Sequence, residues 1–180
     1  PGITDIGDYI FRNAIPGAMN IPQIVEKTHD KLGYKKIAIM YSNNNDQMVG
    51  EHQYYLDACQ KLGLDVVADV TFADKDTDFS AQLTQIQAAN PDVIAIAGLY
   101  QEGSLIVKKA REMGLNQPIL AGNGFNSPEY IKQAGEAADG TLVATPWNPD
   151  RKSEKAQAFR KAFKEKFGHE PDQFAAQAYD

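Results

Sequence analysis

The amino-acid sequence predicts an α/β fold, a three-layer α/β/α sandwich whose five-stranded, mainly parallel sheet carries helices on both faces. Short apolar runs alternate along the chain with longer segments of helical periodicity, which is the pattern of strands joined by helical crossovers. The 180 residues, 43% of them apolar, suffice for the core of one ordinary domain. No fixed-period repeat or low-complexity linker interrupts the alternation.

Five apolar runs predict the strands, and each run ends at a turn or a polar segment. They cover residues 36–41, 65–72, 92–98, 118–122 and 140–144. The segments between them have apolar residues at helical spacing. These segments predict helices over residues 21–32, 47–62, 79–89, 103–113 and 128–134. Five parallel strands with intervening helices follow from this order.

Capping residues mark several of the helix boundaries. Asp78 or Thr77 precedes the third helix, where a side-chain oxygen accepts hydrogen bonds from the first free amides. Ser127, Pro128 and Glu129 combine an N-cap, a proline at the first helical position and an acid that suits the helix dipole. Left-handed C-caps are expected at Gly33, Gly63 and Gly114.

The carboxyl-terminal stretch differs from the rest of the chain. A helix-breaking segment at residues 148–150 (NPD) precedes a predicted helix in which Phe159, Phe163 and Phe167 are spaced four residues apart. Such a stripe requires a packing partner and is typical of structural contact rather than of a cofactor site. Residues 171–179 have the pattern of a further helix. We therefore expect an α/β lobe over residues 1–146 and a separate segment over residues 147–180.

Charge and apolar content disfavour nucleic-acid partners and membrane-spanning segments. A formal net charge of −6 disfavours nucleic acids, which proteins bind through clustered Lys and Arg. No apolar run reaches the roughly 20 residues that span a bilayer. The first residues lack the basic and apolar regions of a signal peptide, so we expect a mature, trimmed or fragmentary chain. The single cysteine, Cys59, is expected to be a small buried residue of a helix.

Motifs for cofactors, metals and catalysis are absent or incomplete in the sequence. Gly122-Asn123-Gly124 begins like a dinucleotide-binding loop, but Ser127 stands where the third glycine belongs, and no P-loop occurs. The three histidines are scattered without metal-ligand spacing. No strand end offers the aspartate of a receiver domain, and no serine lies in a nucleophile elbow. We therefore expect no cofactor, no metal and no enzymatic activity.

Polar and aromatic residues instead follow successive predicted strands. Open α/β sheets bind ligands outside the carboxyl ends of their strands, so these residues are expected to converge. Without a catalytic relay, such a ring is typical of a binding site for a small polar molecule. The candidate ligand-binding residues are Asn45 and Asp46 after the first strand, Tyr100, Gln101 and Glu102 after the third, and Asn123, Phe125 and Asn126 after the fourth.

Several of these residues also have a structural explanation. Asn45 or Asp46 can cap the helix that begins at residue 47. Glu102 falls in the first turn of a helix, where an acid stabilises the helix dipole without touching a ligand. Trp147, after the fifth strand, can line a cleft or pack at a hinge. The sequence leaves these alternatives open.

Segments spread over nearly the whole chain resemble one known family. They are residues 9–12 (YIFR), 78–80 (DFS), 90–92 (NPD), 110–114 (AREMG), 134–135 (AG) and 144–146 (ATP), together with Tyr100 and Glu102. In this order they resemble the branched-chain amino acid (Leu/Ile/Val) binding proteins of ABC importers, which are type I periplasmic binding proteins. Members of that family are roughly twice as long. The resemblance therefore implies one lobe, the carboxyl-terminal one, with residues 147–180 crossing back to a missing N-terminal lobe.

The resemblance implies an extracytoplasmic solute-binding component of an ABC importer, which closes on its ligand about a hinge and is recognised by a membrane permease. Its location would be periplasmic or extracellular, with or without a lipid anchor. The ligand would be an amino acid, an amide or a small carboxylate, and Tyr100 would lie against it. A ligand-sensing domain of a receptor or transcriptional regulator is the alternative, because fold alone does not choose between the two.

Asn123 departs from the pattern of that family. The matching position in the amino-acid-binding relatives commonly carries an acid that pairs with the ammonium group of the ligand, and an amide lacks that charge. A buried ammonium without a carboxylate partner is costly. Either Glu102 or Asp46 supplies the charge, or the ligand is not an α-amino acid.

Overall fold

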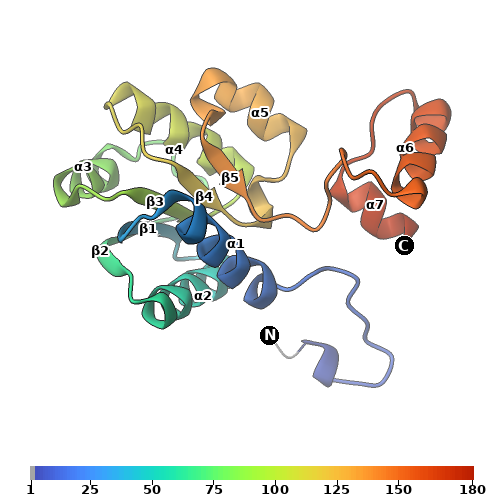
Figure 1. Cartoon of the computed structure of the whole chain (residues 1–180), viewed down its shortest axis with the longest axis horizontal. Coiled ribbons are helices and arrows are strands. Elements are labelled where there is room, and N and C mark those ends of the chain that lie inside the picture. The colour runs from blue at the N-terminus through green and yellow to red at the C-terminus, as the bar shows by residue number, and fades with distance from the viewer. Residues whose placement is uncertain (1–2) are drawn as a thin grey trace. The chain divides into compact units, whose positions relative to one another are not determined.

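A five-stranded sheet forms the centre of the computed structural model, which describes residues 3–180 (Figure 1). All neighbouring strands run parallel, in the order β2-β1-β3-β4-β5. The predicted α/β fold with five strands is confirmed, although β4 and β5 are shorter than expected. The strands are β1 (Lys36–Ser42), β2 (Asp65–Phe72), β3 (Val93–Ala97), β4 (Ile119–Ala121) and β5 (Thr141–Val143).

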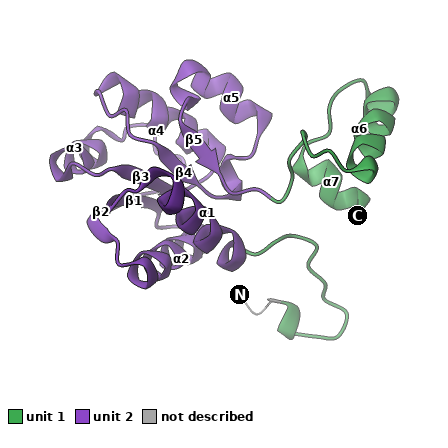
Figure 2. Ribbon diagram, viewed as in Figure 1, with its two compact units in different colours: residues 1–16, 146–180 green, residues 17–145 purple. Residues whose placement is uncertain are grey.

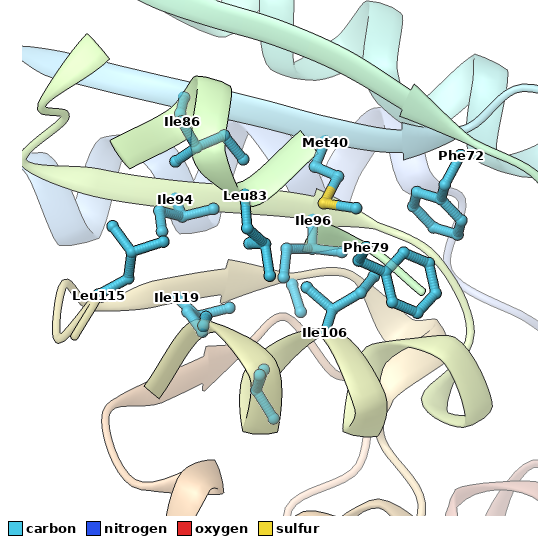
Figure 3. Packing of buried hydrophobic residues seen from close by; sticks show 14 of the residues in the cluster. Met40, Phe72, Phe79, Leu83, Ile86, Ile94, Ile96, Ile106, Leu115 and Ile119 are labelled. Atoms are coloured by element: carbon cyan, nitrogen blue, oxygen red, sulfur yellow. The ribbon is translucent and has the colours of Figure 1, made fainter. Parts of the chain in front are cut away.

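Helices cover both faces of the sheet because alternate residues of each strand point to opposite sides. On one face, Ile37 and Ile39 of β1 belong to the apolar cluster formed with α1 and α2. On the other, Ala38 and Met40 belong to the cluster formed with α3, α4 and α5, part of which Figure 3 shows around Met40. These helices are α1 (Gly17–Leu32), α2 (Asp46–Leu62), α3 (Ser80–Ala89), α4 (Tyr100–Glu112) and α5 (Pro128–Ala134).

Two helices begin earlier than the sequence predicts. α1 starts at Gly17, four residues before the expected boundary, and contains Pro22. α4 starts at Tyr100, because the amide of Gly103 already donates a helical hydrogen bond of 2.9 Å to the carbonyl of Leu99. Tyr100, Gln101 and Glu102 therefore form the first turn of α4 rather than a loop before it. Two short 3₁₀ helices, η2 (Asn123–Phe125) and η3 (Gly135–Ala138), belong to the same part of the fold, and a third, η1 (Ile3–Asp5), precedes α1.

Side chains near two of the predicted helix starts accept hydrogen bonds from backbone amides, although the N-cap of α3 itself is Phe79, which has no side-chain cap bond. Asp78 Oδ1 accepts a hydrogen bond of 3.0 Å from the amide of Ser80, at the start of α3. Ser127 Oγ accepts one of 3.2 Å from the amide of Glu129, with Pro128 at the first position of α5. These side chains fix where the loops at the carboxyl edge of the sheet end. Positive φ angles at the expected C-caps occur at Gly33, Gly63 and Gly114.

The chain forms two compact units, shown in Figure 2. The α/β unit comprises Gly17–Thr145. The other unit comprises Pro146–Asp180 with the residues up to Pro16, whereas the sequence assigned residues 1–16 to the α/β lobe. The expected division at residues 146 and 147 stays a prediction.

Within the second unit, an aromatic cluster holds α6 (Glu154–Phe167) and α7 (Gln173–Tyr179) together. The ring of Phe159 lies 5.7 Å from that of Trp147, 5.7 Å from that of Phe163 and 4.6 Å from that of Tyr179, between centroids. The Phe stripe thus packs on its own unit, except that Phe167 is exposed. None of the helices among the described residues is long and apolar enough to cross a membrane.

Candidate functional site

The strand order reverses once, between β1 and β3, and this marks the expected ligand-binding position at the carboxyl edge of the sheet. From β1 the chain passes to β2 on one side, and β3, β4 and β5 follow on the other side. In open parallel sheets, ligands bind at such a reversal, outside the carboxyl ends of the two diverging strands. The register pairs Tyr41 with Ala97 and Ile96 with Ala121, so β1, β3 and β4 end side by side. The loops after these three strands carry the predicted site residues.

Asn45 in the loop after β1 is held by internal hydrogen bonds. Its Oδ1 accepts from the amides of Gln47 (3.1 Å) and Met48 (3.4 Å), which caps α2. Its Nδ2 donates to Asp74 Oδ2 at 2.9 Å, and Asp74 also accepts from Ser42. The capping explanation for Asn45 is therefore realised in the structure. Asp46, the next residue, is exposed at the first position of α2.

Asp74 was not among the residues selected from the sequence. It lies in the turn after β2, and its carboxylate ties that turn to the loop after β1. The amide of Asp74 in turn donates to Asn44 Oδ1 at 2.7 Å. A signal was available, because the turn after β2 (residues 73–76, ADKD) is another polar strand end. In the structure it holds the turn after β2 against the loop after β1.

Of the three candidate ligand-binding residues in the first turn of α4, two are at least partly exposed and one is buried. Tyr100 is half-buried and Gln101 is exposed. Glu102 is only 6% exposed, and its Oε1 accepts a hydrogen bond of 2.8 Å from the amide of Lys75. Lys75 has a positive φ of 75°, which is unfavourable for a residue with a side chain. The Glu102 carboxylate thus stabilises the turn after β2.

The loop after β4 is packed closely against its neighbours. Asn123 is half-buried, and its Oδ1 is covered without a hydrogen-bond partner among the described residues. Asn126 Nδ2 donates to Thr145 Oγ1, at 2.5 Å, just after β5. A Cβ on Gly124 would lie 2.3 Å from the carbonyl oxygen of Gly98, so only glycine allows this approach. The loops after β3 and β4 therefore touch.

Phe125 lies in the core beneath this loop. Its ring is 1% exposed and lies 4.9 Å from the ring of Tyr130, between centroids. It occupies the space beside Gly103 of α4, where a Cβ would come within 2.3 Å of Phe125 Cζ. Phe125 thereby anchors the loop that carries Asn123 to the helix that carries Tyr100.

A buried acid, Glu51 of α2, lies next to the same loop and was also missed. It is 3% exposed, and its Oε1 accepts a hydrogen bond of 3.2 Å from Gln47 Nε2. Burial raises the pKa of Glu51, and the hydrogen bond from Gln47 lowers it in part. A Cβ on Gly122 would lie 2.3 Å from Glu51 Oε2. The spacing from Met48 places Glu51 on the apolar face of α2, which the sequence could have indicated.

Six of the eight predicted residues thus remain at least partly exposed at one edge of the sheet, and four have partners within the chain. Their assignment as ligand-binding residues stays a prediction. Within residues 3–180, no group of three or more His, Cys, Asp or Glu side chains could hold a metal ion. The partly exposed residues are Asn45, Asp46, Tyr100, Gln101, Asn123 and Asn126; those with internal partners are Asn45, Glu102, Phe125 and Asn126.

Comparison with known proteins identifies relatives over almost the whole chain. A family model described as periplasmic binding protein matches residues 5–180. The Leu/Ile/Val-binding protein homolog 4 of Brucella abortus is 29% identical over 165 residues, which cover 91% of this chain and 39% of that protein. The resemblance noted in the sequence is thereby confirmed.

Solved structures give the same result for the fold. The leucine binding protein LivK of Thermotoga maritima is 33% identical, with a TM-score of 0.92, and the match covers 98% of this chain and 51% of that one. The branched-chain amino acid transporter substrate binding protein LivJ of Streptococcus pneumoniae, solved with isoleucine, is 34% identical, with a TM-score of 0.92, and the match covers 99% of this chain and 51% of that one.

The chain spans about half the length of these solved relatives and 39% of the curated one. It therefore corresponds to a single lobe of such a protein. The family is one of binding proteins rather than enzymes. On the match over residues 5–180, this chain belongs to the periplasmic binding protein family, as a homologue of the branched-chain amino acid binding proteins of ABC transporters.

Proposed function

We propose that this lobe forms one wall of a binding site for a small amino acid, within the extracytoplasmic solute-binding component of an ABC importer. The observation that carries the proposal is the convergence of three loops at the crevice between β1 and β3. They bring Asp46, Tyr100 and Asn123 to one edge of the sheet. The isoleucine bound to the Streptococcus relative supports an amino acid as the ligand.

Four of the partly exposed residues would contact the ligand in this proposal. Tyr100 offers an aromatic ring, whose large apolar surface suits an aliphatic side chain. Gln101, Asn123 and Asn126 offer amides that hydrogen-bond polar groups of the ligand. The internally bonded Asn45 and Glu102 keep the loops in position instead. The wall is therefore rigid before the ligand arrives, which reduces the entropic cost of binding.

The other wall would come from the second half of a full-length family protein. Ligand binding would close the two lobes about a hinge and exclude water, and a membrane permease would recognise the closed form. We propose that residues 147–180 belong to the crossing region that packs on the second lobe. Exposed apolar side chains in this unit support such a partner, among them Phe167 and Phe174.

Nuclear magnetic resonance titration of the 180-residue chain with L-leucine, L-isoleucine and L-valine tests the proposal. Because one wall is present, we expect a Kd on the order of 1 mM, about −4 kcal/mol. Tyr100→Ala should weaken binding about tenfold, by about 1.4 kcal/mol. Tyr9→Ala is the matched control, since Tyr9 is 92% exposed in the other unit. Equal affinities for the Tyr100→Ala and Tyr9→Ala variants would contradict the proposal.

A further inference from the structure

The loop after β4 contains an asparagine followed directly by a glycine, Asn123-Gly124, and no other asparagine of the sequence has a glycine after it. The side-chain amide of an asparagine can be attacked by the backbone nitrogen of the next residue, which closes a cyclic imide and expels ammonia. A side chain on that next residue shields the nitrogen, whereas glycine leaves it accessible. The most reactive kind of asparagine pair thus lies at the carboxyl edge of the sheet.

The packing of the loop requires glycine at position 124. A Cβ there would lie 2.3 Å from the carbonyl oxygen of Gly98 and 3.3 Å from Leu99 Cδ2. Both neighbours belong to the turn between β3 and α4. The close approach of these two loops therefore demands the very residue that makes Asn123 reactive.

The two groups that would react are not held by hydrogen bonds. Asn123 Oδ1 is covered and has no hydrogen-bond partner among the described residues, so the side chain gains by turning toward water. The amide of Gly124 also donates to none of the described residues. It belongs to the second residue of η2, and the first amides of a helix have no acceptor within the helix. Both the side-chain amide and the attacking nitrogen are therefore free to move.

Asn126, in the same loop, is held at both corresponding positions. Its Nδ2 donates to Thr145 Oγ1 at 2.5 Å. The backbone nitrogen that would attack it, that of Ser127, donates to the carbonyl of Phe125 at 2.8 Å. Both bonds must break before the Ser127 nitrogen can reach the side chain of Asn126. This residue therefore serves as an internal comparison for Asn123.

The single turn of η2 is held weakly. Ring closure requires rotation of the Gly124 nitrogen toward the side chain of Asn123. The turn is closed by hydrogen bonds of 3.2 Å, from Phe125 to Gly122, and 3.1 Å, from Asn126 to Asn123. Both lie at the long end for amide–carbonyl bonds, and the geometry of 3₁₀ bonds is poor in general. Local opening of this turn gives the reactive geometry while the sheet stays folded.

We propose that Asn123 is a site of spontaneous deamidation in the folded chain. The Gly124 nitrogen bonds to Cγ of Asn123, the bond from Cγ to Nδ2 breaks, and Nδ2 leaves as ammonia with the proton of the Gly124 amide. Water then opens the imide. Attack at Cγ gives aspartate, and attack at the main-chain carbonyl carbon gives isoaspartate. Either product adds one negative charge to the formal net charge of −6.

The packing on both sides of the reaction favours aspartate over isoaspartate. Isoaspartate lengthens the main chain between residues 123 and 124 by one methylene group. Gly124 lies against Gly98, and Phe125 is 1% exposed beside Gly103, so neither has room to move outward. The share of isoaspartate should therefore be lower when the folded chain reacts than when the chain reacts in concentrated urea.

Peptide mapping by mass spectrometry of the 180-residue chain, aged in mildly alkaline buffer, tests the proposal. Amide loss should be at least about tenfold faster at Asn123 than at Asn126, because two further hydrogen bonds hold Asn126. Asn123→Gln should abolish the main acidic variant in isoelectric focusing, since glutamine must close a larger ring, which is slower. Asn126→Gln is the matched control and should keep that variant.

Three results would overturn the proposal. They are amide loss at Asn123 only in urea, equal rates at Asn123 and Asn126 in the folded chain, and an acidic variant of unchanged amount in Asn123→Gln. The comparison of the two asparagines is made on wild type and does not depend on whether a variant folds. The reaction needs no ligand, so its absence would leave the proposed function standing.

Discussion

Replacing Gly103 by alanine tests the packing that joins α4 to the loop after β4. The new Cβ would lie 2.3, 2.6 and 2.7 Å from Cζ, Cε2 and Cε1 of Phe125. Carbon atoms in contact are separated by about 3.5–4.0 Å, so the ring must retreat by roughly 1 Å. Phe125 has no free space for this movement, because it is buried against Tyr130. Overpacking of this kind costs about 1–3 kcal/mol.

Alanine also favours the helix by about 0.5–1 kcal/mol relative to glycine, so the net loss in free energy of unfolding should be about 0–2.5 kcal/mol. Urea denaturation followed by circular dichroism measures this loss. Gly50→Ala in α2 is the matched control, since a Cβ there meets nothing within 4 Å. It should stabilise the chain by about 0.5–1 kcal/mol. If Gly103→Ala proved as stable as Gly50→Ala, the description of this contact would be wrong.

Two further predictions concern the site loops. Asn45→Ala removes the cap of α2 and the bond to Asp74, and should lower the free energy of unfolding by about 1 kcal/mol in urea denaturation, whereas an unchanged value would refute the capping role. Burial raises the pKa of Glu51 above its unfolded value of about 4.3. The folded state is therefore most stable with respect to this group below about pH 4.3, and the free energy of unfolding falls as pH rises through the folded pKa. Wild type should therefore lose more free energy of unfolding than Glu51→Gln between about pH 4.3 and 7, while the lowered pKa values of Asp78 and Asp92 act below about pH 3.9. Equal slopes for the two proteins would contradict the assignment.

The sheet could be predicted from the sequence because strands buried on both faces read as apolar runs. The runs around Ile37 and Val93 are of this kind, and their order with the helices leaves few topologies. The hydrogen bonds of Asp78 and Ser127 near helix starts could be predicted for a similar reason, since each side chain binds an amide two residues further along the chain. Local patterns therefore indicated the fold and the edge at which polar residues gather.

Contacts between distant residues could not be predicted in this way. Gly103 was predicted to begin a helix, yet it lies inside α4, where Phe125 fills the space that its side chain would occupy. Glu102 has a backbone amide of Lys75 as its partner, and the sequence gives no sign of such a group. That Glu51 meets Gly122 depends on how α1, α2 and β4 pack together. The division of the site residues between surface and interior is decided by these contacts.

A map of the amide shifts that L-leucine causes on the 180-residue chain locates the binding site. We propose that an amino acid binds at the carboxyl edge of the sheet, between the ends of β1, β3 and β4. The map should therefore show changes concentrated in residues 42–47, 98–103 and 122–126. Changes confined to the opposite edge, around Tyr34 and Asp92, or no changes at saturating leucine, would contradict the claim.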